Sequence, residues 1–68
     1  MPTRLDSQMA AKAPKPDEIR KAREHANLSR TAAAALIYKS VRTWEKWENG
    51  ERAMDPAFWE LWRIKVSQ

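Results

Sequence analysis

The chain has 68 residues, enough for one small domain, and it contains no cysteine and a single glycine. Because cysteine is absent, neither disulfides nor thiolate metal sites can stabilise so small a core. The 13 basic residues outnumber the 9 acidic ones, and the net charge of +4 favours polyanionic partners only moderately.

Several function classes are excluded by what the sequence lacks. No apolar run approaches the roughly 20 residues that cross a bilayer, so we expect a cytoplasmic protein without membrane contact. His25 is the only histidine, and the acidic residues are spread along predicted helices. We therefore expect no enzymatic activity, no metal, no cofactor and no small-molecule ligand.

Residues 1–15 carry Arg4, Lys12 and Lys15 against a single acidic residue, Asp6, and show no apolar period. This composition predicts a flexible basic arm, followed by a folded domain over residues 16–68. Two interpretations of the arm stay open. It is either a terminus without a role or an extension that reaches a DNA backbone or minor groove.

The first predicted helix begins at Pro16, whose fixed φ suits a first helical turn, and it continues to residue 26. Ser29 is a favourable N-cap for a second helix over residues 30–37, which contains four consecutive alanines. Ala34 is small enough to let a neighbouring helix approach closely.

A short turn at residues 38–39 follows, and Ser40 is the predicted N-cap of a third helix over residues 41–49. Gly50 is placed to end this helix in the left-handed conformation that glycine favours. Residues 51–54 are interpreted as a linker.

Trp44 and Trp47 lie three residues apart, and therefore on one face of the third helix. With Ala34 behind them and a short turn before them, they suit a helix-turn-helix whose third helix is held by its inner face. The predicted fold class is all-α: a compact bundle of four short helices with a central helix-turn-helix and a flexible N-terminal arm.

The fourth helix is capped by Asp55 and is apolar around much of its circumference. One small domain cannot easily cover so much apolar surface, so a subunit contact is expected here. We expect Phe58 and Leu61 to face the core and Trp59 or Trp62 to lie at the dimer interface.

Residues 19–65 resemble the Cro/repressor-type helix-turn-helix family of phage and mobile-element regulators. The likeness is closest from Leu28 to Gly50, where Ser40, Thr43 and residues 47–50 match the family's pattern. The run from residue 43 to 50, followed by an arginine, is also similar to small anti-CRISPR-associated repressors and plasmid regulators.

The resemblance implies base contacts from residues on the outer side of the third helix: Val41, Arg42, Glu45 and Lys46. It implies DNA backbone contacts from residues around that helix: Arg30, Lys39, Ser40, Thr43 and Arg52. Arginine paired with guanine is the commonest specific contact, and Arg42 is the strongest candidate for it. The alternative for Arg42 and Lys46 is a solvated helix face without a ligand.

The resemblance also implies an internal ion pair between Arg23 and Glu48. Two positions depart from the family. Tyr38 stands where glycine is usual, and Lys39 stands where an apolar residue is usual, so the turn is expected to differ in geometry.

The resulting hypothesis is a transcriptional repressor that autoregulates a phage or mobile-element operon. It would bind double-stranded DNA as a homodimer on an inverted repeat, as the resemblance to Cro/repressor-type proteins implies. Two alternatives stay open: the antitoxin of a toxin–antitoxin pair, and a protein-interaction module that uses the tryptophan-rich last helix.

Overall fold

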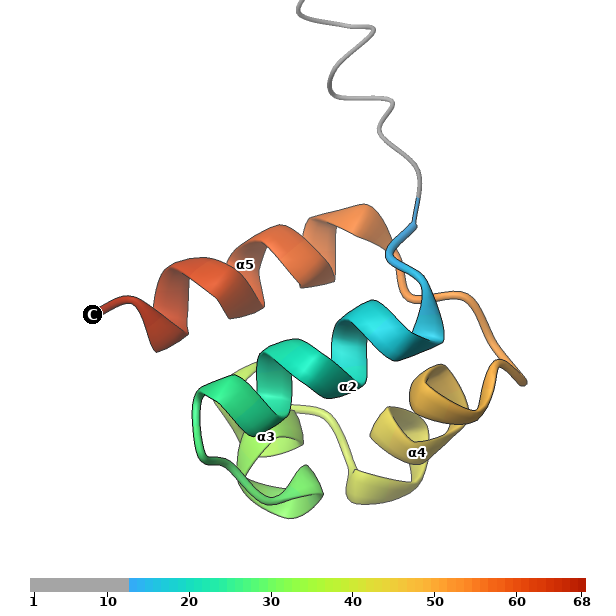
Figure 1. Cartoon of the computed structure of the whole chain (residues 1–68), viewed down its shortest axis with the longest axis horizontal. Helices are drawn as coiled ribbons and strands as arrows, with labels where there is room; N and C mark the ends of the chain where they lie inside the picture. The colour runs from blue at the N-terminus through green and yellow to red at the C-terminus, as the bar shows by residue number, and fades with distance from the viewer. Residues whose placement is uncertain (1–12) are drawn as a thin grey trace, which may run out of the picture.

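The computed structural model describes residues 13–68, and over this range the chain is all-helical. The helices are α2 (Pro16–His25), α3 (Arg30–Leu36), α4 (Val41–Asn49) and α5 (Pro56–Val66). In Figure 1, α5 runs along the top, α2 crosses the middle, and α3 and α4 lie below. The predicted all-α fold with four short helices is confirmed. The predicted arm lies outside the described residues as far as residue 12, and Pro14 near its end is buried.

The helix starts follow from side chains that accept otherwise unpaired backbone N–H groups. Ser29 accepts from Ala32 at 3.0 Å at the start of α3, and Ser40 accepts from Thr43 at 3.2 Å at the start of α4. Asp55 accepts from the Ala57 N–H at 2.8 Å at the start of α5. All three caps are as predicted.

The ends of α2, α3 and α4 share one backbone motif. Each end has a residue with positive φ: Asn27 (59°), Tyr38 (61°) and Gly50 (80°). The N–H of the following residue donates back across the turn, from Leu28 to Arg23 (3.2 Å), from Lys39 to Ala34 (3.0 Å) and from Glu51 to Lys46 (2.9 Å). This arrangement satisfies carbonyl groups that a helix end leaves unpaired. As a result α2 and α3 each end one residue earlier than predicted.

The core is built mainly from indole rings and alanine. Trp44 is completely buried, and its ring centroid lies 5.6 Å from that of Trp47 and 5.4 Å from that of Trp62. Ala33 and Ala34 are also buried, so α3 contributes little bulk and α4 can lie close against it. The prediction that Trp44 and Trp47 hold α4 from its inner face is confirmed.

Two predictions for α5 are wrong. Trp62, expected at a subunit contact, is 1% exposed and donates its indole N–H to the Ala33 carbonyl at 3.1 Å, so it belongs to the core of this chain. Leu61, expected in the core, is 37% exposed. Met54, in the segment interpreted as a linker, is fully buried and completes the core beside the indoles.

Candidate nucleic-acid interface

The turn between α3 and α4 keeps the left-handed geometry in spite of its tyrosine. Tyr38 has a φ of 61°, and 82% of its surface is exposed. A non-glycine residue in this conformation costs roughly 1–2 kcal/mol, and the hydrogen bonds that close the turn offset that cost. The expectation of a different turn geometry is therefore wrong.

The side chains of the turn contact α5. The Lys65 ammonium donates to the Tyr38 hydroxyl at 3.0 Å and lies 4.3 Å from the centre of its ring. The Lys39 ammonium lies 4.4 Å from the centre of the Phe58 ring. Lys39 is half-buried and directs its charge at an aromatic face.

The outer face of α4 carries most of the residues proposed to contact bases. Arg42, Glu45 and Lys46 line one shallow hollow together with Asn49 and Glu51. Val41 is half-buried at the start of the helix and does not line the hollow. Because two acidic and two basic residues share this hollow, it offers a pattern of donors and acceptors and no excess of positive charge.

The residues proposed to contact the DNA backbone lie at the start of α3 and near the two ends of α4. Arg52 is exposed just beyond Gly50, and Arg30 is exposed at the start of α3. Ser40 and Thr43 lie at the start of α4, where the two hydroxyl oxygens are 3.1 Å apart.

A buried carboxylate, that of Glu48, connects α4 to α2 and α3. Its side chain is 3% exposed, and its closest charged partner is Arg23, whose Nε donates to Oε2 at 2.6 Å. Trp44 donates its indole N–H to the same oxygen at 2.6 Å, and Arg30 donates from Nε to Oε1 at 3.2 Å. We call these four residues the Glu48 cluster. The ion pair with Arg23 that the family resemblance implied is confirmed, whereas the link to Arg30 was not predicted.

The cluster keeps Glu48 ionised. Burial by itself raises the pKa of a carboxyl, because water no longer solvates the charge. The hydrogen bonds from Arg23, Trp44 and Arg30, with the positive charge of Arg23, outweigh burial and leave the pKa of Glu48 below its ordinary value. Arg23 also donates to the Leu28 carbonyl at 3.1 Å, so it is held on both sides.

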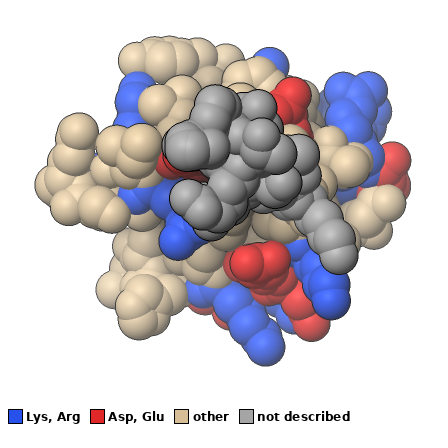
Figure 2. Space-filling view, turned by 90° about the horizontal axis from the view of Figure 1, so that it is seen from above, with Lys and Arg blue, Asp and Glu red and all other residues tan. Residues whose placement is uncertain are grey.

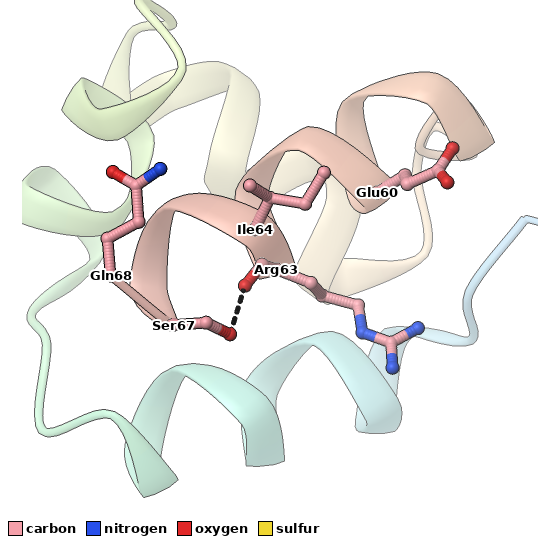
Figure 3. Close-up of a pocket in the computed structure, with 5 residues that line it drawn as sticks. All are labelled: Glu60, Arg63, Ile64, Ser67 and Gln68. Carbon is pink, nitrogen blue, oxygen red and sulfur yellow. Dashed lines mark hydrogen bonds between the residues drawn. The ribbon is translucent and has the colours of Figure 1, made fainter.

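The surface of α5 turned away from the core exposes aliphatic side chains. Ile64 is 53% exposed, and Figure 3 shows it leaving the helix in a different direction from Arg63. The hollow drawn there is lined by α5 residues from Glu60 onward and by the two residues that follow the helix, including Ser67, whose hydroxyl donates to the Arg63 carbonyl at 2.8 Å. Trp59 is half-buried and stacks on Trp62, with ring centroids 5.7 Å apart.

None of the helices between residues 13 and 68 is long and apolar enough to cross a membrane. Over the same described residues, histidine, aspartate and glutamate form no group of three or more that could hold a metal ion.

Comparison with known protein families matches residues 17–61 to a family described as "Helix-turn-helix domain". A search of curated proteins finds no match. The matched range runs from the first turn of α2 into α5, and so includes the capped α3–α4 pair and most of the packing that supports it. The chain belongs to the helix-turn-helix domain family of DNA-binding regulators.

Proposed function

We propose that this protein is a sequence-specific transcriptional repressor that binds an inverted-repeat operator as a homodimer and autoregulates its own operon. The observation that carries the proposal is that one face of α4 is buried in the core while the opposite face is polar and accessible. Trp44 and Trp47 are buried on one side, while Arg42, Glu45 and Lys46 line the outer hollow on the other. A helix presented in this way can enter a major groove with its polar face toward the base edges.

Within α4, each proposed base contact has a distinct chemistry. Arg42 can donate two hydrogen bonds to one guanine, and Lys46 can donate to the same kind of acceptor one turn later. Val41 can pack against a thymine methyl group, and Glu45 can accept from a cytosine amino group. Asn49, one further turn along the hollow, offers the amide pattern that pairs with adenine.

Contacts to phosphates would set the position of α4 without reading the sequence. We assign them to basic groups and hydroxyls at the start of α3 and near the ends of α4: Arg30, Lys39, Ser40, Thr43 and Arg52. Because the α4 hollow has balanced charges, these residues would supply most of the attraction to the backbone.

For the dimer, we propose a contact that does not include Trp62, because Trp62 is buried in the core. Among residues 13–68, the large hydrophobic side chains that are exposed are Tyr38, Leu61 and Ile64, and half-buried Trp59 is a further candidate for the dimer contact. Figure 2 views the molecule from the α5 side, where basic and acidic side chains are interspersed with uncharged surface. Such a mixed surface suits a second subunit better than a polyanion.

The origin in a phage or other mobile element rests on the resemblance of residues 28–50 to the Cro/repressor-type regulators. We infer that repression is controlled by protein concentration and operator affinity.

The decisive experiment is selection of bound duplexes from a random DNA pool, followed by measurement of affinity at several salt concentrations. We expect one enriched sequence with two-fold symmetry and half-sites about 34 Å apart. Enrichment of a sequence without symmetry would remove the dimer but keep the DNA-binding function. Failure to enrich any sequence would remove the function.

The oligomeric state is tested by sedimentation at tens of micromolar protein, with and without the selected DNA. We expect a dimer that Ile64→Glu converts to a monomer, because a buried charge at an apolar contact is unfavourable. Ala53→Glu is the matched control, since it adds the same charge at an exposed position outside α5. A wild-type monomer in both conditions would contradict the dimer.

A second candidate function is a protein-interaction module, which the exposed Leu61 and Ile64 favour. The two functions differ in their response to salt. Affinity for DNA that falls steeply with salt yet keeps a preference for one sequence supports the repressor.

A further inference from the structure

Arg30 is the one member of the Glu48 cluster that is both charged and well exposed. Half of its side-chain surface is accessible, compared with 11% for Arg23 and 3% for Glu48. It also lies at the first position of α3, whereas the carboxylate that binds it belongs to α4. The contact therefore joins the two helices of the helix-turn-helix at a solvent-exposed edge.

We propose that Glu48 is a positioning residue for DNA binding, which fixes the guanidinium of Arg30 so that its terminal nitrogens clamp a backbone phosphate. This inference rests on the proposed function and deepens it. A phosphate contact by Arg30 is already part of that function. The new element is that a buried carboxylate on α4 sets the orientation of the arginine.

The hydrogen bond from Arg30 Nε to Glu48 leaves the edge formed by the two Nη nitrogens available to an anion. Nε donates to Glu48 Oε1 at 3.2 Å, and within residues 13–68 neither Nη nitrogen has a hydrogen-bond partner. The two Nη groups form a fork that matches two oxygens of one phosphate. A guanidinium held by its Nε can therefore present this fork without first choosing among many side-chain conformations.

The charges of the Glu48 cluster also favour an anion at Arg30. Glu48 carries one negative charge and faces two arginines, so one positive charge remains uncompensated. Only 11% of the Arg23 side chain is exposed, and its donors are directed at Glu48 and the Leu28 carbonyl. Glu24 approaches Arg23 only at 4.0 Å and is 60% exposed, so water and salt screen its charge. The uncompensated charge therefore lies on Arg30, where an anion can reach it.

The role of Arg30 is tested with the full chain and a random-sequence duplex, with anisotropy measured over a range of salt. We expect Arg30→Ala to weaken binding about tenfold and to reduce the slope of log K against log salt by about one per protomer. Arg20→Ala is the matched control, because Arg20 is also partly exposed (41%) and paired with a carboxylate, that of Asp17. We expect this control to change the slope by less than half as much.

The positioning role of Glu48 is tested by two further variants. Arg30→Lys keeps the charge but has no fork, so we expect a nearly unchanged salt slope with affinity several-fold lower. In Glu48→Gln, studied at a temperature where circular dichroism shows it folded, Arg30→Ala should cost much less affinity than it does in the wild type. This loss of coupling is not expected from a purely structural role.

The outcomes distinguish failure of this inference from failure of the proposed function. If the wild type binds DNA but Arg30→Ala matches Arg20→Ala in slope, or Arg30→Lys binds like the wild type, the inference is overturned and the function stands. If the effect of Arg30→Ala is the same in both Glu48 backgrounds, Glu48 does not position the arginine. If the wild type shows no salt-sensitive binding to any duplex, the proposed function itself fails.

Discussion

The indole N–H of Trp62 donates to the backbone carbonyl of Ala33 at 3.1 Å, and this contact joins α5 to the middle of α3. Trp62 is only 1% exposed, and its ring also packs against Trp44. The last helix thus completes the core on which the helix-turn-helix rests.

We expect Trp62→Ala to lower the free energy of unfolding by about 3–5 kcal/mol, because it leaves a large cavity and removes a buried hydrogen-bond donor. Urea denaturation followed by circular dichroism measures this loss. Glu60→Ala, at an exposed position of the same helix, should change stability by less than about 0.5 kcal/mol. Similar losses in the two variants would contradict the placement of Trp62.

Arg23→Met should lower the free energy of unfolding by about 3 kcal/mol, because it leaves the buried charge of Glu48 without its closest partner. Arg20→Met is the control on the same helix. Its ion pair with Asp17 is exposed at both ends, so we expect a loss below about 0.5 kcal/mol. Thermal denaturation of both variants measures the difference, and equal melting temperatures would show that the Glu48 cluster adds no stability.

The Glu48 cluster also predicts a dependence of stability on acid. Because the folded-state pKa of Glu48 lies below the ordinary value of 4.5, the folded state binds this proton more weakly than the unfolded chain. The stabilisation is complete above that ordinary value and is lost as the pH falls through the lower, folded-state pKa.

Melting curves of the wild type and Glu48→Gln from neutral to strongly acidic pH measure this effect. We expect the advantage of the wild type to be constant at neutral pH and to shrink only below the ordinary carboxyl pKa. An advantage independent of pH would rule out ionised Glu48 as its source.

Tyr38→Gly should raise stability by roughly 0.5–1 kcal/mol, because glycine adopts positive φ freely and Tyr38 is almost fully exposed. Tyr38→Ala is the informative comparison, since alanine removes the aromatic side chain but keeps the strained conformation. We expect alanine to be no more stable than the wild type in urea. If both variants behave alike, backbone strain at this turn does not limit stability.

Arg42→Ala should relax the preference at one base pair of the selected operator by about 1–3 kcal/mol and leave the rest of the specificity unchanged. Affinities for the operator and its single-base variants measure this change. Arg63→Ala, which removes an exposed arginine from α5, controls for the loss of charge. Unchanged selectivity in Arg42→Ala would assign Arg42 to a solvated face.

The predictions that the structure confirms concern features that neighbouring residues determine. The caps at Ser29, Ser40 and Asp55 were predictable, because each side chain bonds to a backbone group two or three residues away. The burial of Trp44 and Trp47 was predictable from their spacing on one helix.

The wrong predictions for α5 concern packing between distant residues. In α5, apolar side chains point in nearly every direction, so helical periodicity could not distinguish Trp62 from Leu61. Nor could the sequence show that Met54 fills the core from a connecting segment, or that Arg30 reaches Glu48 from another helix. These contacts depend on how the helices are placed in three dimensions.

The backbone motif that ends α2, α3 and α4 has a consequence for how an operator is accommodated. Each connection flanking α3 is restrained by a main-chain hydrogen bond, from Leu28 to Arg23 before the helix and from Lys39 to Ala34 after it. These bonds oppose hinge motion at either connection. We therefore expect the two helices to dock as a rigid body, and any adjustment of fit to come from bending or twisting of the duplex. Base pairs that the protein never touches would then influence affinity through their stiffness.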